Sequence, residues 1–156
     1  MRADYDKAAN EAKLLLNSNP RYSEYRPVNL ALILEDLGLN AQYSNDIVDE
    51  ALLNPMEKMI YIKIDDLPMT RKLFSIAHEI GHWKLHSHDK ARPRSSSNNI
   101  CEEQEANAFA AELLMPYDEV RTLIMLGYRI ENLMNHFNVS YEFAYNRYNF
   151  IISRVF

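Results

Sequence analysis

The chain has few of the residues that mark several classes of protein. It holds a single cysteine, Cys101, so no disulfide can form within it, which is typical of a reducing compartment. No run approaches the roughly 18–20 apolar residues of a membrane-spanning helix. The polar start, MRADYDKAANEAK, does not fit a secretory signal. We therefore predict a cytoplasmic protein with no membrane partner.

Positive charge is also scarce. The chain has 17 Lys and Arg against 22 Asp and Glu, a net charge of −5. Binding to a phosphate backbone relies on a surplus of Lys and Arg, so this balance argues against direct nucleic-acid binding. Aromatic residues recur at helical spacing over 133–151, a segment with one Arg and no Lys. That pattern is typical of core packing and not of a platform for stacked bases.

What remains is the composition of one globular domain. The chain has 156 residues, of which 47% are apolar and 25% charged, enough to bury a core. We predict a single domain over residues 1–156. Within it we expect an N-terminal helical extension at 1–27, a core at 28–116 and C-terminal helices at 117–156.

The spacing of apolar residues predicts an α+β fold, with helices packed around a small, mostly antiparallel three-stranded sheet. Strands are expected at 39–43, 51–53 and 59–64, with a hairpin turn at 54–57. Helices are expected up to residue 19, from Pro27 to a Gly38 cap, at 70–86, at 100–115 and at 116–127. Two short helices should follow, the second capped by Ser140. Residues 90–99, rich in Ser, Arg and Asn, should form a mobile surface loop near the cleft mouth.

His78, Glu79 and His82 form the pattern HExxH inside the predicted helix 70–86. Residues four apart lie on one helix face, about 6 Å apart along the axis, so two imidazoles can bind one ion. Neutral imidazole suits Zn²⁺. Glu79 points in a neighbouring direction, where its carboxylate can take a proton from water and pass it to a leaving amine. The motif is typical of metalloproteases, so we predict one Zn²⁺ bound by His78 and His82, with Glu79 as general base.

A catalytic zinc needs a third protein ligand. The candidates are the glutamates of the predicted helix 100–115: Glu102, Glu103, Glu105 and Glu112. Glu103 shares its face with small residues that allow close approach to another helix, so we choose Glu103 and keep Glu105 as the reserve. Asn107, one turn further on, can hydrogen-bond the second nitrogen of a histidine and fix its tautomer.

The other candidate ligands fit less well. His86 would lie about 12 Å along the axis from His78, and we expect it to cap the helix C-terminus with a partly charged ring. His88 is expected to be solvated, and His136 to lie at the surface or the core edge. Cys101 is expected to be a small, partly buried apolar residue.

Two segments of the chain resemble the ImmA/IrrE family of metallopeptidases. They are RKLFSIAHEIGHW at 71–83, continued by Leu85 and His86, and EQEANAFAAELLMP at 103–116. The segment FNVS at 137–140, with Ala144 and Arg147, is similar to the usual ending of that family. The resemblance covers roughly residues 28–150. One departure is Asp65, where the family often has Asn.

The resemblance implies a zincin-like core and a gluzincin-like site, in which two histidines and a glutamate bind zinc. The spacing from Glu103 to Asn107 is similar to the Glu-xxx-Asp/Asn arrangement of such enzymes. Members often occur in phages and mobile elements beside a helix-turn-helix repressor, which they inactivate by cleavage or by promoting its cleavage. For the developing oxyanion, Arg147 and Tyr145 are candidate donors.

We therefore expect a zinc-dependent endopeptidase that cleaves or inactivates a regulatory protein, such as a helix-turn-helix repressor. Any effect on transcription would act through that partner. The alternative is a non-hydrolytic, zinc-containing regulatory protein that acts by stoichiometric contact. The intact Glu79 favours the peptidase, because a purely structural metal would not need a carboxylate beside the first histidine.

Overall fold

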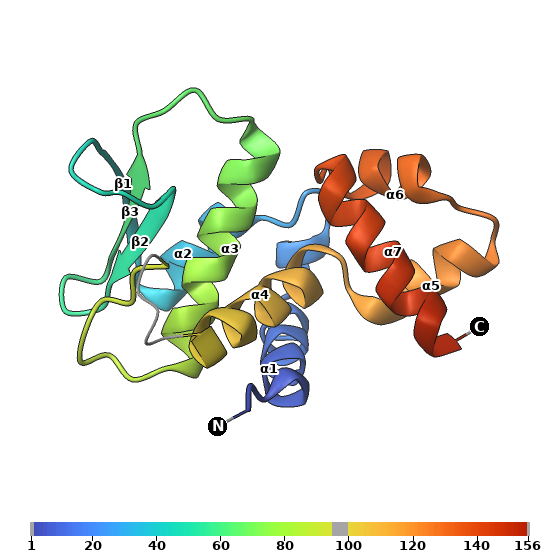
Figure 1. Ribbon diagram of the computed structural model, residues 1–156, viewed down its shortest axis with the longest axis horizontal. Coiled ribbons are helices and arrows are strands. Elements are labelled where there is room, and N and C mark those ends of the chain that lie inside the picture. Colours follow the sequence, from blue (N-terminus) through green and yellow to red (C-terminus); the bar gives the residue numbers. More distant parts are fainter. Residues whose placement is uncertain (1, 95–99, 156) are drawn as a thin grey trace.

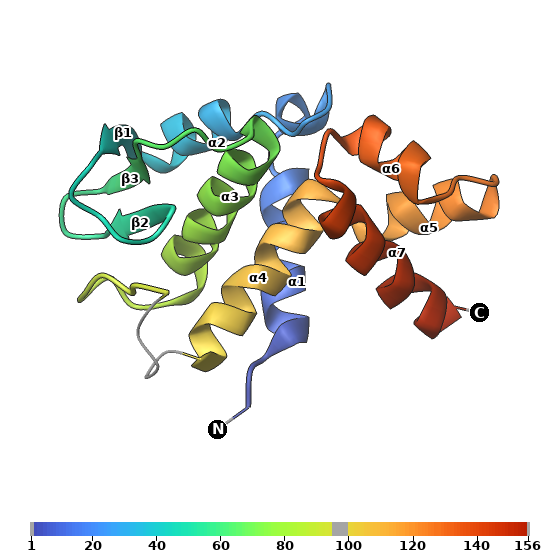
Figure 2. The ribbon, with the colours of Figure 1, turned by 45° about the horizontal axis from the view of Figure 1, so that its top comes forward.

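A computed structural model describes residues 2–94 and 100–155 and has helices packed around one small sheet (Figure 1). The sheet and helix α2 (Leu30–Leu37) lie at one end, and α3 (Met69–Leu85) runs between the sheet and α4 (Ile100–Leu114) (Figures 1 and 2). The other end consists of α5 (Tyr117–Met125), α6 (Ile130–Phe137) and α7 (Tyr141–Val155). The α+β class predicted from the sequence is confirmed.

The sheet has the strand order β1-β3-β2, with β1 at Asn40–Ser44, β2 at Ala51–Asn54 and β3 at Met59–Lys63. A turn of four residues joins β2 to β3 and makes them antiparallel. Strand β3 lies in the middle and runs parallel to β1, so the sheet is mixed and not mostly antiparallel. Its inward face is apolar and includes Leu53 opposite Ile60.

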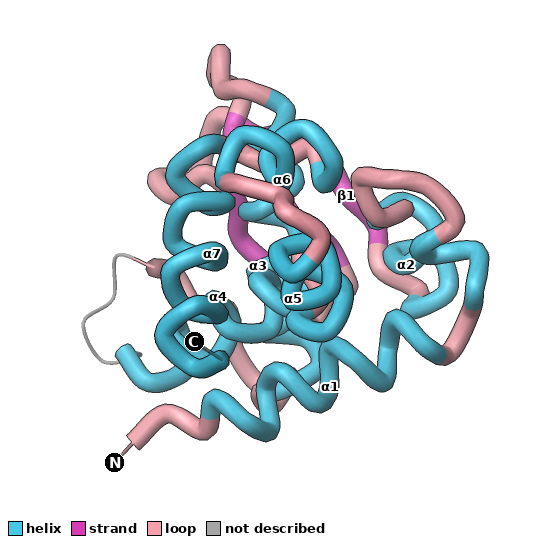
Figure 3. The backbone as a smooth tube through the Cα atoms, turned by 90° about the vertical axis from the view of Figure 1, so that its right-hand side faces the viewer, coloured by secondary structure: helices cyan, strands magenta, loops and turns pink. Residues whose placement is uncertain are grey.

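The two longest helices of the predicted core carry the motif residues and pack against each other. Helix α1 (Tyr5–Asn17) packs on α4 from the side away from the sheet, and Figure 3 shows it running along one edge of the molecule. Its buried residues are the stripe expected from the sequence: Ala8, Ala12, Leu15 and Leu16. They belong to one buried apolar cluster that extends to Ile151 of α7.

Three helix boundaries depend on capping and packing. Helix α2 begins at Leu30 and not at Pro27, because the side chain of Asn29 accepts a hydrogen bond from the Leu32 N–H and caps the helix there. The helix ends at Gly38, whose φ of 72° is left-handed, as predicted. Helix α7 follows Ser140, as predicted, but it is 15 residues long and not short.

Within the ranges 2–94 and 100–155, no helix is both long and apolar enough to cross a bilayer.

Candidate metal centre

The two histidines of the HExxH motif lie one turn apart on the face of α3 that meets α4. His78 and His82 are buried, and their ring centroids are 4.8 Å apart. Gly81 lies at the same contact. A Cβ atom there would come within 3.1 Å of the Phe109 side chain and 3.2 Å of the Ala106 backbone. A glycine at this position therefore allows α4 to approach the histidines closely.

Glu103, in the first turn of α4, reaches both histidines. Its Oε2 lies 2.7 Å from Nε2 of His78, and its Oε1 lies 3.0 Å from Nε2 of His82. Burial opposes the charge of this carboxylate, but the hydrogen bonds to the two imidazoles outweigh burial and lower the pKa of Glu103 to about 2. The fold thus brings together the three side chains predicted as metal ligands.

The second nitrogen of each histidine also has a polar partner. Nδ1 of His78 lies 2.8 Å from Oδ1 of Asn107, the partner predicted from the sequence. Nδ1 of His82 lies 2.9 Å from Nδ1 of His86, whose Nε2 lies 2.9 Å from Oε1 of Glu105. An amide oxygen and a carboxylate only accept hydrogen bonds. His78 therefore donates from Nδ1 to Asn107, and His86 donates to Glu105 and accepts at Nδ1 from His82.

With Nδ1 as the donor to these partners, each ligand histidine presents Nε2 to Glu103, and Nε2 can give up its proton to a metal ion. Burial lowers the pKa of His78 and of His82, which favours the neutral rings that this arrangement requires. Two lone pairs and an ionised carboxylate repel one another at these distances unless a positive charge lies between them. Two imidazoles and one carboxylate are a ligand set of catalytic zinc, so the residues fit the metal that the motif implies.

Two residues differ in role from the expectation. Glu105, the reserve ligand, holds His86 and does not contact the ligand nitrogens of His78 or His82 in the described structure. His86 does end α3, and its N–H donates to the His82 carbonyl. However, burial lowers the pKa of its ring, so it is not the partly charged cap that we expected.

Glu79 lies beside the ligands but faces the sheet. Its Oε1 accepts a hydrogen bond of 2.8 Å from the Leu53 N–H of β2. Its Oε2 lies 3.8 Å from Nε2 of His78 and has no hydrogen-bond partner in the described part of the chain. Burial raises the pKa of Glu79 to about 8, against the opposing charge of Arg94. Although Glu79 lies within ligand distance of the histidines, Glu103 is the carboxylate that meets both Nε2 atoms.

The segment between α3 and α4 carries two arginines whose positions the sequence did not predict. Arg92 is buried and donates to the carbonyls of Ser87 and Lys90 and to Glu102. Arg94 reaches the centre, with Nη2 3.7 Å from Oε2 of Glu79. The two arginines flank one proline in a polar loop. That was the only local feature of the sequence that could have drawn attention to them. Residues 95–99 of the predicted loop lie outside the described residues.

Other candidates lie elsewhere. His88 stacks on Trp83 with ring centroids 3.7 Å apart, and His136 lies 3.4 Å from Glu119. Arg147, one of the two candidate oxyanion donors, donates from Nε to the Met115 carbonyl at the end of α4. Tyr145, the other, is half-exposed on α7.

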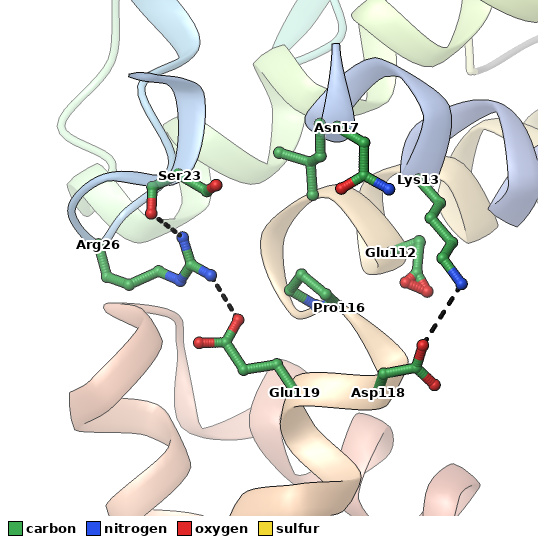
Figure 4. Close-up of a pocket in the computed structure, with 9 residues that line it drawn as sticks. Lys13, Asn17, Ser23, Arg26, Glu112, Pro116, Asp118 and Glu119 are labelled. Atoms are coloured by element: carbon green, nitrogen blue, oxygen red, sulfur yellow. Dashed lines mark hydrogen bonds and ion pairs between the residues drawn. The ribbon is translucent and has the colours of Figure 1, made fainter. Parts of the chain in front are cut away.

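A cavity of about 250 Å³ lies between the N-terminal helices and α5, away from the HExxH motif (Figure 4). Ion pairs of Lys13 with Asp118 and of Arg26 with Glu119 lie on its two sides. Its lining includes Glu112, a candidate that was not chosen as the third ligand, but none of His78, Glu79, His82 and Glu103. The cavity therefore lies apart from the candidate metal centre.

Comparisons with known proteins agree with this fold and site. A family model of peptidases, described as the IrrE N-terminal-like domain, matches residues 29–149. One similar solved structure is a Mycobacterium tuberculosis transcriptional regulator. The TM-score is 0.65 and the sequence identity 20%, over 91% of this chain and 46% of that chain. At that identity the likeness shows the fold alone. Comparison with curated proteins gave no match.

The family match covers most of the chain and includes α3, α4 and every residue of the candidate centre. The present chain spans less than half the length of the mycobacterial regulator, whose activity as a whole does not transfer to it. The family indicates a metallopeptidase-like protein, and the cluster of His78, His82 and Glu103 is the kind of site that such a protein needs. On this basis, the chain belongs to the ImmA/IrrE family.

Proposed function

We propose that this protein is a zinc-dependent endopeptidase that cleaves or inactivates a cytoplasmic regulatory protein, such as a helix-turn-helix repressor. The observation that carries the proposal is the position of Glu79. One carboxylate oxygen is fixed by the Leu53 N–H, while the other faces the ligand histidines without a hydrogen-bond partner among the described residues. A metal held only for structural reasons would not need such a group beside it.

In the proposed mechanism, His78, His82 and Glu103 would hold the ion. Zinc supplies Lewis acidity, which lowers the pKa of water and polarises a carbonyl group. Burial favours the protonated form of Glu79, and the positive charges of the ion and of Arg94 would favour the ionised form that a base needs. Oε2 of Glu79 then takes a proton from the attacking water and later delivers it to the nitrogen of the leaving amine. Asn107 and His86 keep the histidine rings in the required orientation.

The open edge of strand β2 favours a peptide as the substrate. Strand β2 pairs with β3 alone among the described strands, so its other edge has no strand beside it. The Leu53 N–H on β2 donates to Glu79, which places this edge against the centre. An extended peptide can add to such an edge through main-chain hydrogen bonds. This position would bring a peptide bond close to Glu79.

The experiment that tests the proposal is the substitution Glu79→Gln. Glutamine keeps the shape of the side chain but cannot accept a proton in the same way, and loss of a general base typically lowers a rate about 10²–10⁴-fold. We expect the variant to bind zinc as the original protein does and to leave a candidate repressor uncut. Cleavage would be followed by mass spectrometry of the fragments, and zinc content by elemental analysis.

The same experiment separates the second candidate function. If the original protein and Glu79→Gln relieve repression equally in cells and neither produces fragments, the protein is a zinc-containing regulator that acts by stoichiometric contact.

A further inference from the structure

Arg94 is the one cation that the described structure places against Glu79. Its side chain is 25% exposed, and its Nη2 lies 3.7 Å from Oε2 of Glu79. Both Nε and Nη2 are buried and lack a hydrogen-bond partner in the residues described. Oε2 of Glu79 is unpartnered as well, so buried donors and a buried acceptor meet here without bonding each other.

The fold fixes the backbone that carries Arg94. Its N–H donates to Oδ2 of Asp49, in the connection between β1 and β2, at 2.7 Å. Two residues earlier, Arg92 holds the loop through two of its carbonyls and through Glu102 of α4. Arg94 therefore lies beside the centre because contacts with the sheet and with α4 place it there.

An ordinary ion pair does not account for this geometry. A guanidinium that pairs with a carboxylate usually forms N–H···O bonds of about 2.7–2.9 Å, often two at once. At a distance of 3.7 Å, Nε and Nη2 of Arg94 have no acceptor among the described residues. A buried donor without a partner costs about 1–3 kcal/mol, so each one in a native protein needs an explanation, such as a catalytic role or a bound ion.

We propose that Arg94 binds the carbonyl oxygen of the scissile peptide bond and stabilises the oxyanion that forms there. The inference rests on the proposed peptidase function. The water oxygen bonds to the carbonyl carbon, Glu79 takes the water proton, and the carbonyl π electrons move to the oxygen that Arg94 holds. The C–N bond then breaks as those electrons return, and the proton passes from Glu79 to the amine nitrogen. Arg94 thus takes the role that the sequence assigned to Arg147 or Tyr145.

The test needs no known substrate, because inorganic phosphate is a tetrahedral oxyanion. The protein would be loaded with Co²⁺, whose visible absorption reports on the metal site, and titrated with phosphate. Loss of a hydrogen bond to a charged group should weaken phosphate binding about 10–100-fold in Arg94→Ala. Arg94→Lys keeps the charge but loses the fork of donors and should bind phosphate with intermediate affinity. Arg121→Ala, which removes an exposed arginine on α5, is the matched control and should bind as the original protein does.

A second set of phosphate titrations tests whether Arg94 acts on the bound anion directly or through Glu79. In the Glu79→Gln background, Arg94→Ala should still weaken phosphate binding. An unchanged affinity in that background, or tighter binding in Arg94→Ala itself, would overturn the proposal. Once a substrate is in hand, Arg94→Ala should lower kcat about 10²–10³-fold with little change in KM. A protein that takes up no Co²⁺ refutes the proposed function itself, whereas a protein that binds Co²⁺ but shows no effect of Arg94 refutes only the role of Arg94.

Discussion

At the scale of single residues, the centre depends on which nitrogen of each histidine carries a proton. Glu105 sets the tautomer of His86, and His86 sets that of His82. Asn107 does the same for His78 by a direct bond. Residues outside the proposed ligand set would thus decide whether the ligand nitrogens are available to an ion. Such partners typically change metal affinity by about 10–100-fold.

The first prediction concerns the chain of contacts from Glu105 through His86 to His82, which we call the relay. His86→Phe and Glu105→Gln should each lower zinc affinity by about 10–100-fold, because the ring of His82 is no longer held in the required tautomer and orientation. Competition with a chromophoric chelator measures the affinity without any need for a substrate.

Two substitutions serve as matched controls for the relay. His88→Phe keeps the stack on Trp83 and changes a histidine close to the end of the same helix. Gln104→Ala changes an exposed side chain of α4. Both variants should keep the original affinity. The relay has no such role if the affinities of Glu105→Gln and Gln104→Ala are equal.

At the scale of elements, the centre is a contact between two helices. The histidines lie on α3 and Glu103 on α4, so the separation of the helices fixes the geometry of the ligands. Gly81 sets this separation, since any side chain there would meet Phe109 and the Ala106 backbone.

The second prediction is therefore that Gly81→Ala weakens both stability and zinc binding. Extra volume in a packed contact costs about 1–3 kcal/mol, and the better helix propensity of alanine offsets about 0.5–1 kcal/mol of that. We expect a net loss of up to about 2 kcal/mol in the free energy of unfolding, measured by urea denaturation. Lys84→Ala, at an exposed position of α3, should cause no such loss. A gain in stability with unchanged affinity would show that the helices separate without cost.

The third prediction concerns metal removal. An ion bound by both helices stabilises the folded state only, by about 2.7 kcal/mol when its concentration is 100 times the dissociation constant. Calorimetry should show a lower unfolding temperature after treatment with a chelator and recovery with zinc. His82→Ala, which lacks a ligand, should unfold at the same temperature with and without zinc. If the original protein also shows no shift, zinc does not bind the folded state.

At the scale of the whole molecule, α4 connects the candidate metal centre to elements near both ends of the chain. Its first turn carries Glu103, and its last turns carry Glu112, which accepts from the Tyr117 N–H at the start of α5. Arg147 of α7 donates to the Met115 carbonyl, and its Nη2 lies 3.5 Å from Glu112. At the N-terminal end, the Asp4 N–H donates to Glu105. The N-cap residue of α1 thus contacts the relay although it lies outside the matched residues 29–149.

The fourth prediction is that Arg147→Ala lowers the free energy of unfolding by about 3–5 kcal/mol at neutral pH, because it leaves the buried carboxylate of Glu112 without its cation. Urea denaturation measures the change. Arg121→Ala, exposed on α5, should stay within about 0.5 kcal/mol of the original. Equal stability of the two variants would contradict a structural role for Arg147.

The pH dependence of this variant provides a further check. Burial raises the pKa of Glu112 in the folded protein, even with Arg147 present. A raised pKa means that the folded state binds a proton more readily than the unfolded state, so the contribution of the group to stability increases as pH falls through the folded pKa. Removal of Arg147 should raise this pKa further. The stability deficit of Arg147→Ala should therefore shrink on acidification and grow at higher pH.

The sequence alone determined most of the secondary structure and the placement of the two histidines on one helix face. Helical spacing places His78 and His82 on one face of a helix wherever that helix lies, and the small residues around Glu103 indicate a face that packs closely. The boundaries of the three strands were also predicted to within one residue, because alternation and a turn signal are local. The parallel pairing of β1 with β3 was not predicted, since strand order depends on which elements cover the sheet.

Tertiary structure decided the roles of His86, Glu105 and Arg94. Nothing in the sequence distinguishes Arg94 from any other arginine in a polar loop, because its role comes from a contact with Asp49, 45 residues earlier, and from its position beside Glu79. Likewise, Glu105 holds His86 only because α3 and α4 approach each other at Gly81. Local periodicity determines which side chains share a helix face, whereas desolvation and hydrogen-bond pairing arise only when separate segments pack together.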